Sequence, residues 1–284
     1  MKKFAICIFV LFLIQLLETR LVLGQGSSAP TQTNILGMEF ILVHPGRMVV
    51  GRLELQCPDP PERPDVHSDV DWTEDDYRKC QELIALHSQP GFSVEIKNPY
   101  YIGKFEVTQR QWQSVMGDNP SVFQEKKLGV STAAFPVESV TWEDVREFIK
   151  KLNELDSSAN YRLPTEFEWE YAARAGESEL LSWAATKKVA WIQDTNKGSP
   201  QKVGQMEPNA WGLYDMLGNV WEWVEDFYND DLFASPTPPT TGTQHVLKGG
   251  SFTSDVVNAH YFYHGAGPGN GYDVGFRVVM EVKN

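Results

Sequence analysis

The sequence of 284 residues has few basic side chains, because 25 Lys and Arg stand against 38 Asp and Glu, a formal net charge of −13. A protein that binds nucleic acid needs a basic face, so this balance speaks against a nucleic-acid partner. The sequence also lacks a P-loop, a Rossmann glycine fingerprint, a heptad pattern and internal repeats. Its hydrophobic content of 42% is instead typical of a globular protein with a large core.

The N-terminus is predicted to be a secretory signal peptide over residues 1–24. Lys2 and Lys3 form a charged start, an apolar run follows over residues 4–17, and small residues precede Gln25. The apolar run is short for a membrane-spanning helix. We therefore expect an exported protein, periplasmic or secreted, with no transmembrane anchor once the signal is removed.

Cysteine is scarce, and one of the three cysteines, Cys7, leaves with the signal peptide. Cys57 and Cys80 remain as an even pair in an oxidising compartment. We predict that these two form a disulfide that closes an acidic, proline-rich loop. The alternative is two free thiols.

The remaining chain is divided into a flexible leader over residues 25–35 and one domain over residues 36–284, with an insertion at about residues 53–90. Few long periodic segments and many short strands and turns predict an irregular α+β domain. Helices are expected from Thr108, Thr141 and Thr165, each of which can cap a helix. Strands are expected in a hairpin over residues 38–50, in a pair over 92–105, and at 189–192, 245–250 and 276–281.

The segment Gly212–Tyr228 (GLYDMLGNVWEWVEDFY) places large aromatic rings among several carboxylates. Buried carboxylates must be paired, hydrogen-bonded or metal-bound, and Gly212 and Gly218 allow tight turns. We therefore predict an irregular, ring-rich turn with oxygen ligands that point inward. Asp215, Glu222 and nearby backbone carbonyls are hard ligands of the kind that Ca²⁺ collects. The alternative is a structural corner whose acids accept hydrogen bonds from backbone amides.

This segment strongly resembles the signature of the formylglycine-generating enzyme (sulfatase-modifying factor) family. Further stretches match in the same order: YIGKFEVTQRQWQSVMG (101–117), PVESVTW (136–142), YRLPTEFEWEYAARAG (161–176), and KGGSF with GFRV (248–252 and 275–278). Ordered blocks over residues 36–280 are a stronger signal than one short motif. The resemblance implies a C-type-lectin-like fold with little regular secondary structure. It also implies a calcium site made by the side chain of Asp215, the carbonyls of Gly218 and Val220, and the carboxylate of Glu222.

The same resemblance shows what this chain lacks. Enzymes of the family oxidise a substrate cysteine with a copper ion held by two cysteines after the GGS motif, since soft thiolates select Cu(I). Those positions are Ser254 and Ala259 here, so we expect no copper and no oxidase activity by that mechanism. Three histidines flank this loop and are expected to be loop residues rather than metal ligands: His245, His260 and His264.

The loop from Thr253 to Asp273 is rich in Tyr, Ser, Gly and Asn, the residues of adaptable binding loops, and has no Lys or Arg. In retroelement-diversified receptors of the resembled fold, this terminal segment is the varied ligand-binding surface. The alternative is a merely divergent surface loop. The residues predicted to bind a ligand are Ser254, Asp255, Asn258, His260, Tyr261, Tyr263, Asn270 and Tyr272.

These observations predict an exported, calcium-stabilised, non-catalytic domain that binds a protein or a glycan through residues 253–273. One alternative is a divergent metal-dependent oxidoreductase or sulfatase-modifying-type enzyme. Another is a retroelement-diversified receptor or an envelope structural component.

Overall fold

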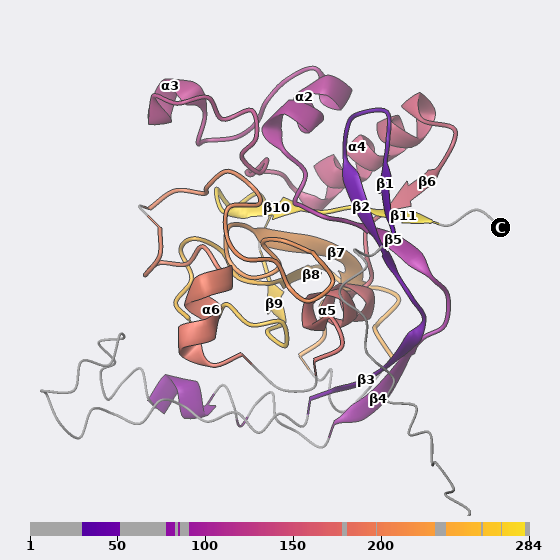
Figure 1. Cartoon of the computed structure of the whole chain (residues 1–284), viewed down its shortest axis with the longest axis vertical. Coiled ribbons are helices and arrows are strands. Elements are labelled where there is room, and N and C mark those ends of the chain that lie inside the picture. Colours follow the sequence, from indigo (N-terminus) through magenta and orange to yellow (C-terminus); the bar gives the residue numbers. More distant parts are fainter. Residues whose placement is uncertain are drawn as a thin grey trace, which may run out of the picture.

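The computed structural model describes residues 30–51, 78–82, 85, 91–177, 181–196, 198–230, 237–256, 258–267 and 269–281. In this part of the chain, helices and short strands are mixed along the sequence and gather around three sheets (Figure 1). Long connecting loops run between them. The predicted irregular α+β fold is therefore confirmed.

A five-stranded antiparallel sheet brings together distant parts of the chain in the order β1-β2-β5-β11-β6. Its strands are β1 (Thr31–Thr33), β2 (Glu39–Val43), β5 (Tyr100–Gly103), β6 (Asn160–Arg162) and β11 (Val279–Glu281). Because β11 lies between β5 and β6, the end of the described chain is held inside the sheet.

The strand β1 corrects part of the expected flexible leader over residues 25–35. Thr31 pairs with Ile41 and Thr33 pairs with Glu39, although all of β1 is exposed. A short polar strand has no apolar alternation, and backbone hydrogen bonds hold it in place. The local sequence therefore carried no signal for it.

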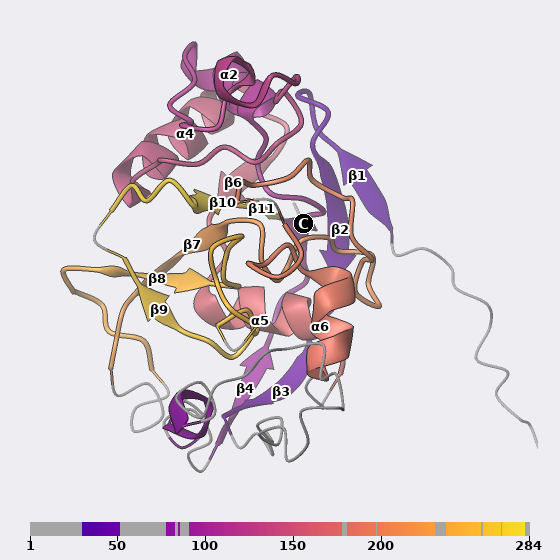
Figure 2. The same cartoon turned by 90° about the vertical axis from the view of Figure 1, so that its left-hand side faces the viewer.

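A four-stranded sheet, in the order β10-β7-β8-β9, forms the second layer (Figure 2). Its strands are β7 (Trp221–Phe227), β8 (His245–Lys248), β9 (Gly265–Ala266) and β10 (Val274–Phe276). β10 runs parallel to β7, and β8 runs antiparallel to it. The predicted ring-rich turn is thus a bend followed by a central strand, and the loop over residues 253–273 lies beside that strand.

The third sheet pairs β3 (Gly46–Val50) with β4 (Phe92–Ile96), and this pairing corrects two expected hairpins. β2 does not pair with β3, and β4 does not pair with β5; instead β2 pairs with β5 and β3 with β4. The expected strands were in the right places, but their partners were wrong. Partner choice depends on contacts between segments about 50 residues apart, which local patterns do not contain.

Three helices begin at the expected threonine caps. They are α2 (Gln109–Met116) after Thr108, α4 (Trp142–Leu155) after Thr141 and α5 (Glu166–Arg174) after Thr165. Each has a complete capping box, in which the threonine and the third helical residue exchange hydrogen bonds. These signals are local, and for that reason the sequence predicted all three helix starts.

The expected strand at residues 189–192 is wrong. The helix α6 (Trp183–Val189) occupies its first position, and only Trp191 forms an isolated bridge, to Gly218. Ser182 caps α6 by accepting a hydrogen bond from the amide of Ala185. A further short helix is α3 (Glu125–Leu128). Within the described ranges, no helix combines the length and the apolar character that crossing a membrane requires.

Helix α5 connects the core to the four-stranded sheet. It packs against β7 and β8, and Trp169 at its centre is fully buried. On the far side of the molecule, α2 and α4 pack together through Trp112 and Phe148, whose rings stack at 5.3 Å. The inner face of α5 therefore points its side chains at the strands that carry the ring-rich segment and the GGS motif.

Most of the predicted insertion at residues 53–90 lies outside the described residues, and residues 78–82 are helical. Cys80 is buried and takes part in a disulfide. Its predicted partner, Cys57, lies outside the described residues, so the pairing stays a prediction. The same holds for the signal peptide.

Candidate functional site

The ring-rich segment makes a tight bend before it enters β7. Asp215, Gly218 and Asn219 all have positive φ, at 53°, 76° and 60°. A Cβ atom on Gly218 would lie 2.3 Å from the carbonyl oxygen of Trp191, so the bend requires glycine here. The amide of Asn219 donates to that same carbonyl at 2.7 Å. The bend is therefore pinned against the segment that follows α6.

A buried arginine from the GFRV motif holds the carboxylate of Glu222. Arg277 donates from Nε to Oε2 at 2.7 Å and from Nη2 to Oε1 at 2.6 Å, and Trp169 Nε1 donates to Oε2 at 2.6 Å. The guanidinium also donates to the carbonyl oxygens of Gly103, Tyr214 and Asp215. One side chain thus ties together the bend, β7 and the end of β5.

Two more buried carboxylates lie near this ion pair. Glu106 accepts hydrogen bonds from the side-chain amide of Asn219 at 2.7 Å and from the backbone of Val220 at 3.2 Å. Asp215 Oδ2 accepts from the amide of Gly204 at 2.6 Å, whereas Asp215 Oδ1 is buried and has no hydrogen-bond partner among the described residues. The cluster therefore holds one unused ligand oxygen.

The electrostatics of this cluster favour an additional positive charge. Burial raises the pKa of Asp215 to about 6, and burial together with the charge of Asp215 raises the pKa of Glu106 well above its usual range. Three buried carboxylates here face the guanidinium of Arg277. Either a proton or a bound cation would relieve the repulsion between them.

The predicted calcium ligands fit this geometry in part. Asp215 fits, because its Oδ1 is buried and unpartnered. Glu222 fits less well, because Arg277 and Trp169 already donate three hydrogen bonds to its two oxygens. Among the residues that the structure describes, no three His, Cys, Asp or Glu side chains are grouped to hold a metal. A calcium ion here would thus depend on backbone carbonyls such as those of Gly218 and Val220.

The two positions that carry copper-binding cysteines in the resembled enzymes lie in the core. Ser254 is buried and its hydroxyl accepts from the amide of Ser251 at 2.9 Å. Ala259 is fully buried, and a Cβ on Gly250 would lie 2.9 Å from its Cα. Neither side chain can supply a thiolate, which Cu(I) prefers.

Each of the three histidines has its own set of contacts. His245 stacks on Trp142 at 3.7 Å, and burial lowers the pKa of His245. His260 is fully buried and stacks on Phe262, and burial lowers its pKa to about 4. His264 lies between Glu166 Oε1, at 2.7 Å from Nδ1, and the carbonyl of Asn229, at 2.8 Å from Nε2. The three were expected to be loop histidines; instead His245 begins β8, and His260 and His264 are buried.

The acids of α5 divide into two groups. Glu168 belongs to the outer group, where Arg162 pairs with Glu168 at 2.6 Å and with Glu281 at 3.0 Å. Glu166 and Glu170 instead point inward, where the fully buried Lys248 lies 3.4 and 3.3 Å from them. They lie four residues apart on the inner face of the helix, which explains why they share that lysine.

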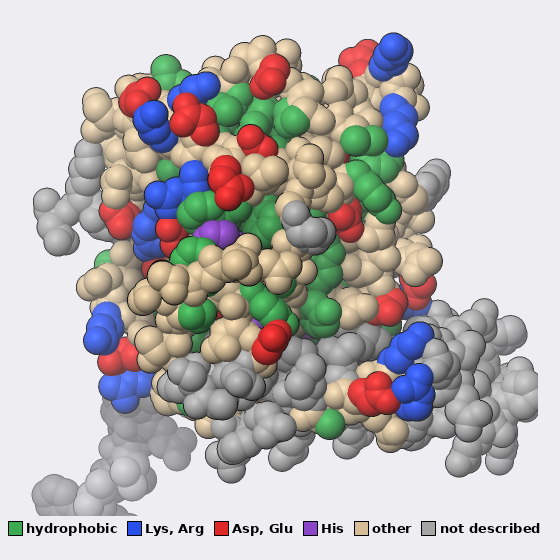
Figure 3. Space-filling view, turned by 180° about the vertical axis from the view of Figure 1, so that it is seen from behind, with side chains coloured by type: hydrophobic (Ala, Val, Ile, Leu, Met, Phe, Trp, Pro, Cys, Tyr) green, Lys and Arg blue, Asp and Glu red, His purple; other side chains and the backbone are tan. Residues whose placement is uncertain are grey.

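A hollow of about 620 Å³ opens beside β7, and we name it the loop hollow. The loop over residues 253–273 and its neighbours line it: Trp221, Tyr228, Gln244, Leu247, Tyr263, His264, Gly265, Ala266, Gly267, Gly269, Asn270, Gly271, Asp273 and Val274. Two rings from different segments, Trp221 and Tyr263, lie 5.4 Å apart within it. Figure 3 views the side of the molecule that carries β8 and β9, where apolar side chains lie exposed among polar ones. None of these described lining residues is Lys or Arg.

The eight residues predicted to bind a ligand do not form one surface. Tyr263 and Asn270 line the loop hollow. Asp255, Asn258 and Tyr272 reach the solvent outside it, and Tyr272 packs near Phe123. Ser254, His260 and Tyr261 are buried, because the loop folds back into the core at these positions. As surface contacts, these three are therefore wrong.

Sequence reasoning missed the part of the hollow that comes from outside the loop. Trp221 and Tyr228 belong to the ring-rich segment, and Gln244 precedes β8. Their aromatic character was visible in the sequence. Only the pairing of β8 with β7 and β9 brings them to the loop.

Comparisons with known proteins agree with this geometry. The model of the sulfatase-modifying factor enzyme 1-like domain matches residues 26–282. The chaperone protein LppX of Paenibacillus barcinonensis is 33% identical over 237 residues, which cover 64% of this chain and 80% of LppX. The formylglycine-generating enzyme of Thermomonospora curvata is 35% identical over 198 residues, which cover 60% of either chain.

Two solved structures share the fold at low sequence identity. Treponema denticola variable protein 1 has a TM-score of 0.70 at 24% identity and covers 89% of this chain and 99% of its own. PvdO from Pseudomonas aeruginosa also has a TM-score of 0.70, at 19% identity, and covers 91% of this chain and 100% of its own. With its ordered motifs, its fold and a family match along nearly its whole length, this chain belongs to the family of sulfatase-modifying factor enzyme 1-like domains.

Proposed function

We propose that this protein is an exported, non-catalytic member of its family that binds a protein or glycan ligand in the loop hollow. The observation that carries the proposal is the combination of an open, ring-lined hollow with Ser254 and Ala259 at the copper positions. The similar protein LppX is named a chaperone and not an oxidase, which also supports a non-catalytic role.

The lining of the loop hollow favours an uncharged ligand surface. Trp221, Tyr228 and Tyr263 offer aromatic faces, and Gln244 and Asn270 offer amides that can donate and accept hydrogen bonds. The described lining has no Lys or Arg to attract an anion, and its one histidine, His264, is already held between Glu166 and the carbonyl of Asn229. Aromatic faces with a few amides suit the apolar face and hydroxyl edge of a neutral sugar, so glycans are the first class to test.

Replacement of Tyr263 by alanine is expected to weaken ligand binding about 30-fold, because truncating an aromatic anchor costs ~2 kcal/mol. The mature chain would first be screened on an array of neutral and anionic glycans. Affinity for the retained glycan would then be measured by calorimetry. The matched control is Tyr272→Ala, since Tyr272 belongs to the same loop but lies outside the hollow.

If both tyrosine variants lost the same affinity for the glycan, the ligand would bind on the outer surface of the loop. The proposed binding in the loop hollow would then be wrong. Copper-dependent oxidation of a cysteine peptide by the purified protein would overturn the non-catalytic assignment. That result would favour the enzyme alternative, which the similarity to formylglycine-generating enzymes supports.

We also propose a structural calcium ion at the bend, with Asp215 Oδ1 as its first ligand. Chelation is expected to lower the melting temperature by roughly 5–10 °C, because a ligand at 100 times its Kd stabilises by ~2.7 kcal/mol. Differential scanning calorimetry in calcium and in chelator measures this shift, and elemental analysis gives the metal content.

The control for the calcium proposal is Asp215→Ala. This variant is expected to melt at the same temperature in calcium and in chelator, whatever its absolute stability. Equal melting temperatures for the natural protein under both conditions would contradict a calcium ion at this bend.

A further inference from the structure

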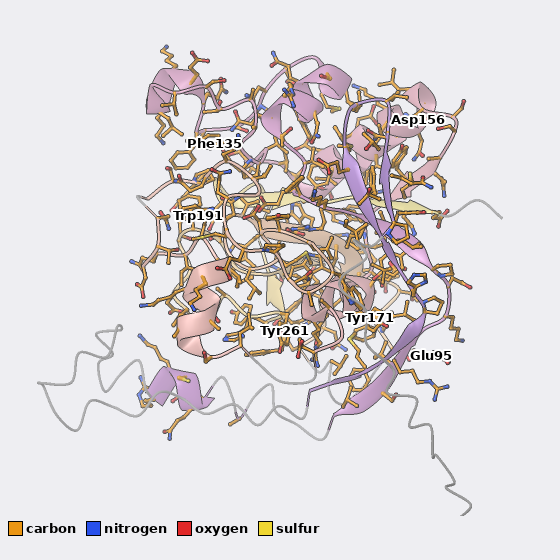
Figure 4. The ribbon with its side chains drawn as sticks, in the orientation of Figure 1. Glu95, Phe135, Asp156, Tyr171, Trp191 and Tyr261 are labelled. Atoms are coloured by element: carbon orange, nitrogen blue, oxygen red, sulfur yellow. The ribbon has the colours of Figure 1, made fainter. Side chains whose placement is uncertain are left out.

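A second hollow, of about 360 Å³, lies between α5, α6 and the segment from Glu207 to Leu217, and we name it the helix hollow. Figure 4 labels Tyr261, which lies between α5 and α6 in that view and borders the hollow. Apolar side chains form most of the walls: Leu181, Val189, Leu213, Met216, Leu217 and the ring of Tyr261. A volume of this size is at the lower end for small-molecule sites. The helix hollow therefore suits a small, largely apolar group.

A buried guanidinium borders the helix hollow with one donor unused. Arg174 is 5% exposed, pairs with Glu170 and lies with its guanidinium carbon 5.0 Å from the centre of the Tyr261 ring. Its Nε–H group is buried and has no acceptor among the described residues. A buried N–H group without an acceptor costs free energy. A ligand in the hollow cannot reach Nε itself, but it would meet the guanidinium of Arg174, which lines the hollow and carries a positive charge.

Acidic side chains stand at the opening of the same hollow. Glu177 and Glu207 both line it and are both exposed, and neither forms an ion pair within the described part of the chain. The side chain of Asn209, also in the lining, already forms hydrogen bonds through both of its polar atoms. Its Nδ2 donates to the carbonyl of Ala172, and its Oδ1 accepts from the amides of Trp211 and Leu213. Asp215 borders the hollow too, but the proposed calcium ion would occupy its free oxygen. The helix hollow thus offers an inner donor and an outer pair of negative charges.

We propose that the helix hollow binds an apolar α-amino acid residue with a free ammonium group, either as the free amino acid or as the first residue of a peptide. Its carbonyl or carboxylate oxygen lies against the guanidinium of Arg174, and its ammonium group lies near Glu177 and Glu207. Its apolar side chain packs against the walls. A simple anion would be repelled by the two glutamates, and a simple cation would be repelled by the guanidinium of Arg174. The proposal is independent of the loop hollow.

Calorimetric titration of the mature protein in calcium tests this proposal with two probes, L-leucine and the peptide Leu-Gly-Gly. Ala210→Trp narrows the opening, because Ala210 lines the hollow and is exposed. Ala184→Trp is the matched control, because Ala184 is exposed on α6 but does not line the hollow. The double variant Glu177→Gln/Glu207→Gln changes only exposed side chains and tests the charge. Melting curves show that each variant is folded.

We expect saturable binding that Ala210→Trp abolishes, that Ala184→Trp leaves unchanged, and that the double variant weakens about tenfold. N-acetyl-leucine, which has no ammonium group, is expected to bind at least about tenfold more weakly than leucine. If leucine binds and the peptide does not, the ligand is a free amino acid. If the peptide binds as tightly as leucine or more tightly, the ligand is the N-terminus of a peptide. Absence of binding for both probes up to about 10 mM, or binding that Ala210→Trp retains, would overturn the proposal.

Discussion

Replacement of Arg277 by methionine is expected to lower the free energy of unfolding by ~3–5 kcal/mol, because it leaves the buried carboxylate of Glu222 without its cation. Arg277 is 0% and Glu222 is 1% exposed, so water cannot take the place of the guanidinium. The variant also removes the donors to the carbonyls of Gly103, Tyr214 and Asp215. Urea unfolding of the natural protein and the variant measures the difference.

The matched control for this prediction is Arg47→Met. Arg47 pairs with Glu95 at 2.9 Å, but the two side chains are 73% and 48% exposed. An exposed ion pair contributes at most about 1 kcal/mol, so this variant is expected to unfold almost like the natural protein. If both variants lost the same stability, burial would not be the cause. If calcium binds at the bend as proposed, Arg277→Met is expected to lose less stability in calcium than in chelator.

Replacement of Gly218 by alanine is expected to cost at least ~3 kcal/mol, since two penalties add. A left-handed backbone conformation costs an alanine ~1–2 kcal/mol, and φ at Gly218 is 76°. The new Cβ would also lie 2.3, 2.7 and 2.8 Å from the carbonyl oxygen, carbonyl carbon and amide nitrogen of Trp191. Backbone atoms cannot rotate away as a flexible side chain can, so the bend must separate from the segment after α6.

Gly212→Ala separates the two penalties, because Gly212 has a φ of 86° but nothing within 4 Å of its would-be Cβ. We expect this control to lose only the conformational penalty of ~1–2 kcal/mol. Denaturant unfolding of both variants gives the contribution of the close approach as a difference. Similar losses for Gly212→Ala and Gly218→Ala would show that the contact with Trp191 does not restrict the bend.

The sequence predicted helix starts better than strand partners, and the reason is the range of the interactions. The capping boxes at Thr108, Thr141 and Thr165 join residues three positions apart, so they can be recognised within one segment. The pairing of β3 with β4 joins Met48 to Val94, and nothing near Met48 selects that partner. The expected hairpin over residues 38–50 was wrong for this reason.

The candidate site was predictable to the same limited extent. Asp215 and Glu222 were recognised as inward-pointing acids because rings and glycines surround them in the sequence. The cation that holds Glu222 is Arg277, which is 55 residues away, and only the fold shows that pairing. Likewise, the composition of the loop over residues 253–273 indicated a binding surface, but it could not show that Tyr261 is buried while Tyr263 lines a hollow.

By itself, the sequence determined the mixed fold class, the helix starts, the glycine requirement in the bend and the absence of thiols at residues 254 and 259. These features follow from residue identity or from contacts within a few positions. Only the tertiary structure decided which strands pair, which cation neutralises the buried acids, and which side chains surround the loop and helix hollows. These depend on segments that meet from distant parts of the chain, where packing and burial select the partner and local propensity has no influence.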